Sequence, residues 1–231
     1  MSLPDILLNI KNISKFYLQG ELKVHALSDI NLTFDKSEFA ALVGPSGSGK
    51  TTLLNLIGGL DAPTSGNIIL NGTNFADLNE QDISQFRLYE IGFIFQAYNL
   101  VPVLSALENV ELVMVLQNRP AKERRERALH YLDLVGLANM INRRPSALSG
   151  GQQQRVAVAR ALAAGPRLVL ADEPTANLDS ENASALLDIM HKLAKEEETT
   201  FIFSTHDLRV MERAERIITL QDGCIQSDNK A

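Results

Sequence analysis

The feature that most constrains this chain is the run Gly44-Pro-Ser-Gly-Ser-Gly-Lys-Thr51, which fits the pattern G-x-x-x-x-G-K-[ST]. It follows the apolar segment 39–43, which we expect to be a buried strand, and precedes segment 52–57, which we expect to be a helix ended by two glycines. Glycines let backbone N–H groups approach phosphate oxygens, and the helix N-terminus adds a partial positive charge. The order strand, glycine-rich loop and helix therefore predicts a phosphate-binding loop in an α/β fold.

Each residue type in this loop has a chemical role. Lys50 can neutralise the β- and γ-phosphates of a nucleotide, and the hydroxyl of Thr51 can ligate Mg²⁺. The predicted phosphate-binding residues are Gly44, Pro45, Ser46, Gly47, Ser48, Gly49, Lys50, Thr51 and Thr52. Many classes of nucleotide-hydrolysing protein share this motif, so the loop alone predicts binding of ATP or GTP and no more.

The rest of the chain alternates short β-rich runs with helical patterns, which is typical of a mostly parallel sheet covered by helices. Residues 68–70 before Asn71-Gly72 resemble an antiparallel strand and turn, and Asp222-Gly223 predicts a hairpin. The pattern between about residues 97 and 165 is helical. We therefore expect one α/β domain over 1–231, in which 1–96 and 161–231 form the catalytic core with a β subdomain and 97–160 form a helical subdomain.

Polar side chains follow three further predicted strands. Asp172 and Glu173 end one apolar strand, Gln96 follows another, and His206 follows a third. Since the carboxyl ends of parallel strands share one edge of a sheet, we expect these groups to converge with the phosphate loop. Asp172 suits Mg²⁺, through a water, and Glu173 suits a general base or a group that positions a water attacking the γ-phosphate.

A second candidate anion site lies at Leu148-Ser-Gly-Gly-Gln152, which opens a predicted helix over 152–164. Ser149, Gly150 and Gly151 would present a hydroxyl and backbone N–H groups at the positive end of that helix. Taken alone, the same residues could be an ordinary N-cap beside a flexible loop.

Charge and composition exclude several classes of protein. The net charge is −6, from 22 basic and 28 acidic residues, which argues against a nucleic-acid-binding face. The basic cluster 122–127 contains two glutamates, so we interpret it as a solvated helix face. The single cysteine, Cys224, allows no intrachain disulfide. We expect no signal peptide at residues 1–12 and no membrane span in the uncharged stretch 91–107, which contains polar residues and a proline.

Together these motifs resemble the nucleotide-binding subunits of ATP-binding-cassette (ABC) transporters over the entire chain. The matching segments are Gly44 to Thr51 (Walker A), Gln96 (Q-loop), Leu148 to Gln152 (signature), Leu168 to Glu173 (Walker B), Asn177 to Asp179 (D-loop) and His206 (switch histidine). The resemblance implies ATP and Mg²⁺ as cofactors, and an aromatic residue stacked on adenine. Tyr17 is the first candidate for that residue and Phe16 the second.

The resemblance also implies roles for these residues. The catalytic residues would be Lys50, Gln96, Glu173 and His206, and the metal ligands Thr51, Gln96 and Asp172. In this family two subunits, here most simply two copies of the chain, pack head to tail. The signature of one then contacts the γ-phosphate held by the other. The further nucleotide contacts would be Ser149, Gly150, Gly151, Gln152 and Asp179.

A narrower resemblance links segments 24–32, 58–66, 106–110 and 171–179 to the bacterial lipoprotein-releasing and macrolide-export ATPases, although Ala176 stands where these typically have glycine. It implies a subunit on the cytoplasmic face of the inner membrane that drives a permease, with a permease helix received beside Gln96. The alternatives are an importer subunit, a soluble ABC-type ATPase acting on ribosomes or DNA, and a regulator that binds ATP without turnover. The transported substrate does not follow from the sequence.

Overall fold

The computed structural model describes residues 5–20 and 22–230, so residues 1–4, where no signal peptide is expected, lie outside it. The chain forms two compact units, one made of Met1–Arg87 with Thr200–Ala231 and the other of Leu88–Thr199. In the described ranges, no helix is long and apolar enough to cross a membrane. The second unit is larger than the predicted helical subdomain 97–160 because strand β6 (Ile91–Ile94) and helix α6 (Ser180–Glu196) both contact helix α5 (Gly150–Ala163).

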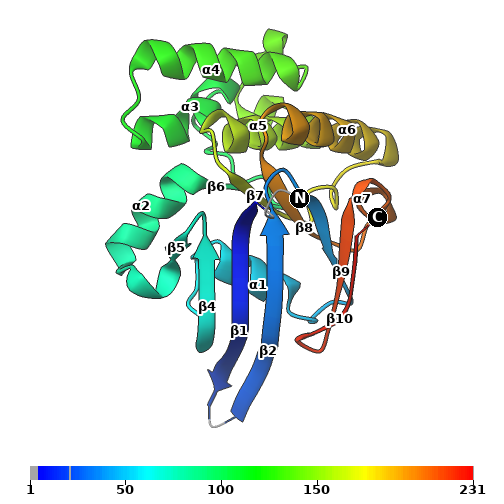
Figure 1. Ribbon diagram of the computed structural model, residues 1–231. Coiled ribbons are helices and arrows are strands. Elements are labelled where there is room, and N and C mark those ends of the chain that lie inside the picture. Colours follow the sequence, from blue (N-terminus) through cyan, green and yellow to red (C-terminus); the bar gives the residue numbers. More distant parts are fainter. Residues whose placement is uncertain (1–4, 21, 231) are drawn as a thin grey trace. The chain divides into compact units, whose positions relative to one another are not determined.

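The first unit contains a four-stranded sheet in the order β2-β1-β4-β5. Its strands are β1 (Ile6–Gln19), β2 (Leu22–Asp35), β4 (Ser65–Leu70) and β5 (Thr73–Asn74). Figure 1 shows β1 lying between β2 and β4, and it pairs antiparallel with both. The predicted strand and turn at 68–72 are confirmed, whereas β1 and β2 were not predicted.

The same unit contains four further strands, of which β3 leads into the phosphate loop. These are β3 (Phe39–Val43), β8 (Thr200–Thr205), β9 (Arg216–Gln221) and β10 (Cys224–Lys230). Strand β3 lies between β8 and β9 and runs parallel to both, whereas β10 pairs antiparallel with β9 through the predicted hairpin. Every residue of β3 is buried, and three phenylalanine rings, Phe39, Phe201 and Phe203, lie with centroids 4.5–5.7 Å apart.

Helices complete the first unit. They are α1 (Lys50–Ile57), the short 3-10 turn η1 (Phe75–Asp77), most of α2 (Glu80–Glu90), and α7 (Leu208–Arg213). The apolar residues of α1 are buried, which explains why the predicted helix over 52–57 is confirmed. It begins two residues earlier, at Lys50, inside the glycine-rich motif.

The second unit combines two parallel strands with four helices. Its elements are β6 (Ile91–Ile94), α3 (Ala106–Leu116), α4 (Ala121–Leu134), η2 (Ala138–Met140), η3 (Pro145–Ala147), α5 (Gly150–Ala163), β7 (Leu168–Asp172) and α6 (Ser180–Glu196). Strands β6 and β7 pair in parallel, with Ile94 opposite Ala171. Helices α3, α4 and α5 pack on one another. Seven of the last nine residues of α5, 155–163, are Val, Ala or Leu, the exceptions being Arg155 and Arg160, and residues 156–163 are all buried.

Candidate active site

The backbone of the phosphate loop requires glycine at two positions. Gly44 and Gly49 have φ of 151° and 103°, values that side chains disfavour. A Cβ on Gly44 would lie 2.0 Å from the carbonyl oxygen of Leu220, and one on Gly49 would lie 2.6 Å from that of Ala26. The glycines therefore let the loop lie directly against neighbouring backbone.

The N-terminus of α1 is not capped by the side chain of its N-cap residue. Its N-cap is Gly49, which makes no side-chain capping bond, and the first turn contains no acidic residue. The first N–H groups of a helix have no partner within the helix, and they add to its positive end. Lys50 is 8% exposed, and its ammonium donates to the carbonyl oxygens of Gly44 (2.7 Å) and Pro45 (2.9 Å). Such a concentration of donors fits a phosphate.

Ser48 gives an independent indication that the loop fits an anion. Its side chain is 2% exposed, and its hydroxyl oxygen finds no hydrogen-bond partner within the described part of the chain. A buried hydroxyl is normally hydrogen-bonded, since an unmet one costs about 1–3 kcal/mol. The loop thus keeps hydrogen-bonding capacity that its own chain does not use.

The switch-histidine candidate lies on the same strand edge as the loop. Val43 of β3 is opposite Thr205 of β8, so His206 follows the strand next to the one that feeds the phosphate loop. The hydroxyl oxygen of Thr205 accepts a bond from the backbone N–H of Asp207 (3.0 Å), which turns the chain there. Within the first unit, these two strand ends therefore lie side by side, while the role of His206 stays a prediction.

Of the two aromatic candidates for the base, the structure favours Tyr17. The Tyr17 side chain is 41% exposed, and its hydroxyl donates to Asp61 Oδ2 (2.8 Å). Partial burial and the neighbouring Asp61 carboxylate raise the pKa of the Tyr17 phenol. Phe16 instead has the ammonium of Lys23 over its ring, 3.7 Å from the centroid.

In the second unit, Gln96 and the carboxylate pair share one edge of the β6–β7 pair, because Ile94 lies opposite Ala171. The Gln96 side chain is exposed, and the backbone carbonyl oxygen of Gln96 accepts a bond from Asn177 Nδ2 (3.0 Å). Glu173 has φ of 46°, in the left-handed region. For a residue other than glycine this conformation costs roughly 1–3 kcal/mol and is enriched at functional sites.

The segment after Gln96 is held by a buried arginine that the sequence did not single out. Arg160 of α5 is 9% exposed and donates to the carbonyl oxygens of Tyr98 (2.9 Å) and Asn99 (2.5 Å). Tyr98 and Asn99 are both left-handed, with φ of 59° and 49°. Burial lowers the pKa of the guanidinium. The signal that could have found Arg160 is its place in the otherwise apolar run 156–163.

The signature segment forms the N-terminus of α5. The hydroxyl of Ser149 accepts from the N–H of Gln152 (3.3 Å), and Gln152 Oε1 accepts from the N–H of Ser149 (3.0 Å), which is a capping box. A Cβ on Gly150 would lie 2.8 Å from the Tyr98 hydroxyl, so Tyr98 covers this end of the helix. Ser149 is thus an N-cap, which is one of the two interpretations of this segment, the other being an anion site.

Asp179 of the D-loop is the N-cap of α6. Its carboxylate accepts bonds from the backbone N–H (2.9 Å) and the side-chain amide (2.7 Å) of Asn182. The backbone bond, followed by the side-chain bond, lowers the pKa of this carboxyl group. In a single copy of the chain, the bonds from Asn182 therefore keep the Asp179 carboxylate ionised and fix its orientation.

The residues available for Mg²⁺ are oxygen ligands. The side chains of Gln96 and Asp172 end neighbouring strands of the second unit, and Thr51 follows Lys50 in the first. Nowhere in residues 5–20 and 22–230 do three or more His, Cys, Asp or Glu side chains gather into a metal site. A few oxygen ligands fit Mg²⁺, which is commonly held by one or two protein groups together with waters and substrate phosphates.

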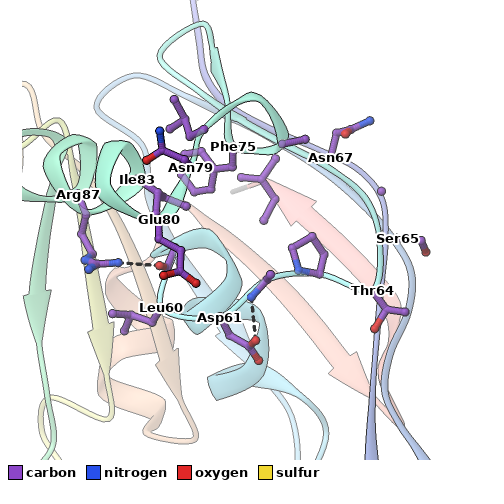
Figure 2. Close-up of a pocket in the computed structure, with 17 residues that line it drawn as sticks. Leu60, Asp61, Thr64, Ser65, Asn67, Phe75, Asn79, Glu80, Ile83 and Arg87 are labelled. Atoms are coloured by element: carbon purple, nitrogen blue, oxygen red, sulfur yellow. Dashed lines mark hydrogen bonds between the residues drawn. The ribbon is translucent and has the colours of Figure 1, made fainter.

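The first unit also contains a cavity of about 680 Å³ that the nucleotide motifs do not line. Figure 2 shows its walls, which come from the loop after α1, strand β4, and the segment from η1 to α2. Leu60, Phe75 and Ile83 supply apolar surface, and Asp61 and Arg87 supply charge. Asp61 is the residue that binds Tyr17, so this loop lies between the cavity and the base candidate.

Comparison with known proteins identifies the class. Residues 27–176 match the family model described as ABC transporter. The chain belongs to the ABC transporter family. Within it, the chain is an ATP-binding ATPase subunit of the group that includes the lipoprotein-releasing and macrolide-export ATP-binding proteins.

Three relatives support this placement. The ABC transporter ATP-binding protein MJ0796 of Methanocaldococcus jannaschii is 44% identical over 97% of both chains. The lipoprotein-releasing system ATP-binding protein LolD of Legionella pneumophila is 42% identical over 96% of this chain and 97% of its own. The macrolide export ATP-binding/permease protein MacB of Bdellovibrio bacteriovorus is 44% identical over 97% of this chain, which spans only 34% of that longer protein.

A solved structure of MJ0796, described as a dimeric post-hydrolysis state of an ATP-binding cassette bound to ADP and Pi, has a TM-score of 0.90 to this chain. It covers 97% of this chain and 98% of its own, at 43% identity. The predicted fold class, an ABC-ATPase α/β fold with an antiparallel β sheet, is confirmed.

Proposed function

We propose that this chain energises a membrane permease by hydrolysing ATP between two head-to-tail copies of itself. The observation that carries the proposal is the N-terminus of α1, which combines a helix end that its N-cap residue does not cap with a buried Lys50 ammonium. This end of the helix is suited to the β- and γ-phosphates of a nucleotide. Tyr17 has an exposed ring that is suited to stacking on adenine, and this stacking is the ground for proposing ATP rather than GTP.

The residues at the strand ends supply the chemistry. Glu173 orients a water and takes its proton, while the water oxygen bonds to the γ-phosphorus and the bond to the β–γ bridging oxygen breaks, giving ADP and inorganic phosphate. Lys50 stabilises the negative charge on the phosphoryl oxygens, and His206 contacts the γ-phosphate. Thr51, Gln96 and Asp172 hold Mg²⁺, which when bound supplies further positive charge to the phosphates.

The second copy completes the site. Ser149, Gly150, Gly151 and Gln152 of the partner's signature contact the γ-phosphate from the opposite side, and Asp179 lies at the same interface. The solved structures of MJ0796 support this pairing, because both are described as dimeric. ATP then joins the two copies and its hydrolysis releases them, which converts chemistry into movement.

The permease is proposed from the relatives, whose names specify lipoprotein release and macrolide export. The chain would then lie on the cytoplasmic face of the inner membrane without contacting nucleic acid. A cytoplasmic helix of the permease would dock beside Gln96, against Tyr98 and Leu100. This segment is fixed to α5 by Arg160, so force applied there reaches the helix that carries the signature.

Glu173→Gln tests the reaction and the pairing together. The variant keeps the size and the backbone of Glu173 but cannot take a proton, so hydrolysis should fall about 10²- to 10⁴-fold. Phosphate release measures the loss, and light scattering should show a dimer that forms with ATP and persists. Unchanged turnover would refute the role of Glu173, and a chain that stays monomeric with ATP would refute the shared site.

Tyr98→Glu tests the docking surface. Co-purification with its membrane permease should be lost, because a charge replaces an aromatic contact, while Leu208→Glu, at a 68% exposed position of α7, should leave it intact. Retention of the permease by both variants would place the docking surface elsewhere. Co-purification with ribosomes or DNA instead would favour the soluble alternative.

A further inference from the structure

The loop between α1 and β4 returns to strand β1 and binds it through one carboxylate. Asp61 Oδ1 accepts from the ammonium of Lys15 (2.7 Å) and from the N–H of Ala62 (2.7 Å), and Asp61 Oδ2 accepts from the hydroxyl of Tyr17 (2.8 Å). The side chains of Lys15 and Asp61 are 12% and 32% exposed. Both oxygens of the Asp61 carboxylate therefore accept a bond from a side chain of β1.

This loop is itself fixed at several points. Arg87 donates to the carbonyl oxygen of Gly59 (2.6 Å), and the N–H of Leu60 donates to Asn55 of α1 (2.9 Å). The N–H of Thr64 donates to the carbonyl oxygen of Ser14 in β1 (2.9 Å). Figure 2 shows the first of these bonds, and it shows Asp61 bonded to Ala62 at the edge of the cavity. The carboxylate is thus presented from a rigid support.

The contacts restrain the Tyr17 ring and leave it accessible. The hydroxyl is held by Asp61, and the ammonium of Lys15 lies 4.8 Å from the ring centroid. The side chain nevertheless keeps 41% of its surface exposed. An aromatic ring that is already ordered loses less conformational entropy when a second ring stacks on it.

We infer that Asp61, itself fixed by Lys15, is a positioning residue that orients Tyr17 as the platform for the nucleotide base. The inference rests on the proposed function, since it assumes that Tyr17 stacks on the base. It assigns the loop after α1 to recognition of the base, separately from the phosphate loop before α1. Removing Asp61 should then weaken binding of the base and spare binding of the phosphates.

The test compares ADP with inorganic pyrophosphate, which lacks the adenosine. Calorimetry on the full chain should show that Asp61→Ala weakens ADP binding about threefold to tenfold, as expected for loss of one charge-assisted bond. Pyrophosphate binding should not change. Asp61→Asn retains an acceptor for the Tyr17 hydroxyl and should recover part of the affinity. The matched control is Asp5→Ala, which removes an exposed carboxylate paired with Lys36 at 2.8 Å and should change neither ligand.

A spectroscopic measurement separates positioning from support of the loop. The chain has no tryptophan and four tyrosines, so phenol ionisation can be followed by absorbance, with Tyr17→Phe identifying the contribution of Tyr17. Partial burial and Asp61 raise the pKa of Tyr17 above its usual 10.0. Asp61→Asn should therefore lower that pKa toward 10.0. An unchanged Tyr17 titration in this variant would contradict the inference.

The outcomes distinguish the inference from the proposal beneath it. If Tyr17→Ala leaves the difference between ADP and pyrophosphate intact, the base-stacking role of Tyr17 fails, and the inference fails with it. If Tyr17→Ala removes the difference but Asp61→Ala does not, only the inference is overturned. Equal losses of ADP and pyrophosphate in both Asp61 variants would show that Asp61 merely supports the fold of the loop, which would also overturn it.

Discussion

Helices α1 and α5 both begin at a segment rich in glycine and serine, and both N-termini are predicted to bind phosphate, yet they begin differently. At α1 the N-cap is Gly49, in a left-handed conformation, with no side chain to accept from the first turn. At α5 the N-cap is Ser149, and a capping box with Gln152 satisfies both the Gln152 N–H and the Ser149 N–H. The N-terminus of α1 therefore has no side-chain cap, whereas the N-terminus of α5 is capped by Ser149 and Gln152.

This difference indicates that the two helix N-termini act at different stages of nucleotide binding. An open N-terminus with a buried Lys50 offers a strong primary site for phosphate. A capped N-terminus is stable without ligand and keeps only the remaining glycine N–H groups and the hydroxyl hydrogen of Ser149 to offer. We therefore expect α1 to bind nucleotide in a single chain and α5 to act when a second copy arrives.

Among variants at these two helix ends, Lys50→Ala should produce the largest effect. It removes the buried ammonium that lies across Gly44 and Pro45, and loss of one such electrostatic group lowers turnover about 10²- to 10³-fold. ATP binding by the single chain should weaken too, unlike in Glu173→Gln. Phosphate release and calorimetry measure both effects. Lys192→Ala, at an exposed ion pair of α6, is the control that should retain activity. Retained ATP binding by Lys50→Ala would remove the distinction between the two helices.

Ser149→Asp should separate the cap from the phosphate contact. Aspartate is as good an N-cap as serine, so thermal stability should be retained, but its charge repels the γ-phosphate. ATP-dependent dimerisation should weaken about tenfold or more because like charges at an interface cost several kcal/mol. Ser149→Arg should block the dimer by its size. Neither variant should change ATP binding to the single chain. Light scattering that shows a normal dimer in both would contradict the shared site.

Gly49→Ala and Gly47→Ala compare two glycines of the same loop. Both have positive φ, but a Cβ on Gly49 would meet Ala26 at 2.6 Å, whereas no atom lies within 4 Å of one on Gly47. We expect Gly47→Ala to lower the free energy of unfolding by about 1 kcal/mol from the left-handed conformation alone, and Gly49→Ala by about 2–3 kcal/mol. Denaturant unfolding measures both. Equal losses would mean that the loop can move away from β2.

The sequence predicted the elements whose patterns are local and regular. Strand β3, helix α1 and the β9–β10 hairpin each combine an apolar run with glycine or turn residues. Strands β1 and β2 were missed because their pairing is irregular. The register shifts between Ile10 and Ile13, and Asn12 and Asp29 are left-handed, so apolar and polar residues do not alternate.

The site was predictable to the same degree. Motif residues such as Lys50, Gln96 and Glu173 are recognisable because spacing and strand context define them, and the structure places them at the expected strand and helix ends within each unit. Their assembly into one site stays a prediction. Arg160 and Asp61 were missed, because their roles depend on contacts with residues 61 and 44 positions away in the chain, which no local pattern encodes.

The backbone conformation of Glu173 sets stability against activity when this residue is substituted. Its left-handed φ of 46° suits glycine better than glutamate. Glu173→Gly should therefore raise the free energy of unfolding by up to about 1–2 kcal/mol while abolishing hydrolysis, and Glu173→Gln should leave stability unchanged. Thermal denaturation beside a phosphate-release assay would show it. A library of variants selected for thermal stability alone would then enrich inactive chains at this position, so activity must be scored in every round.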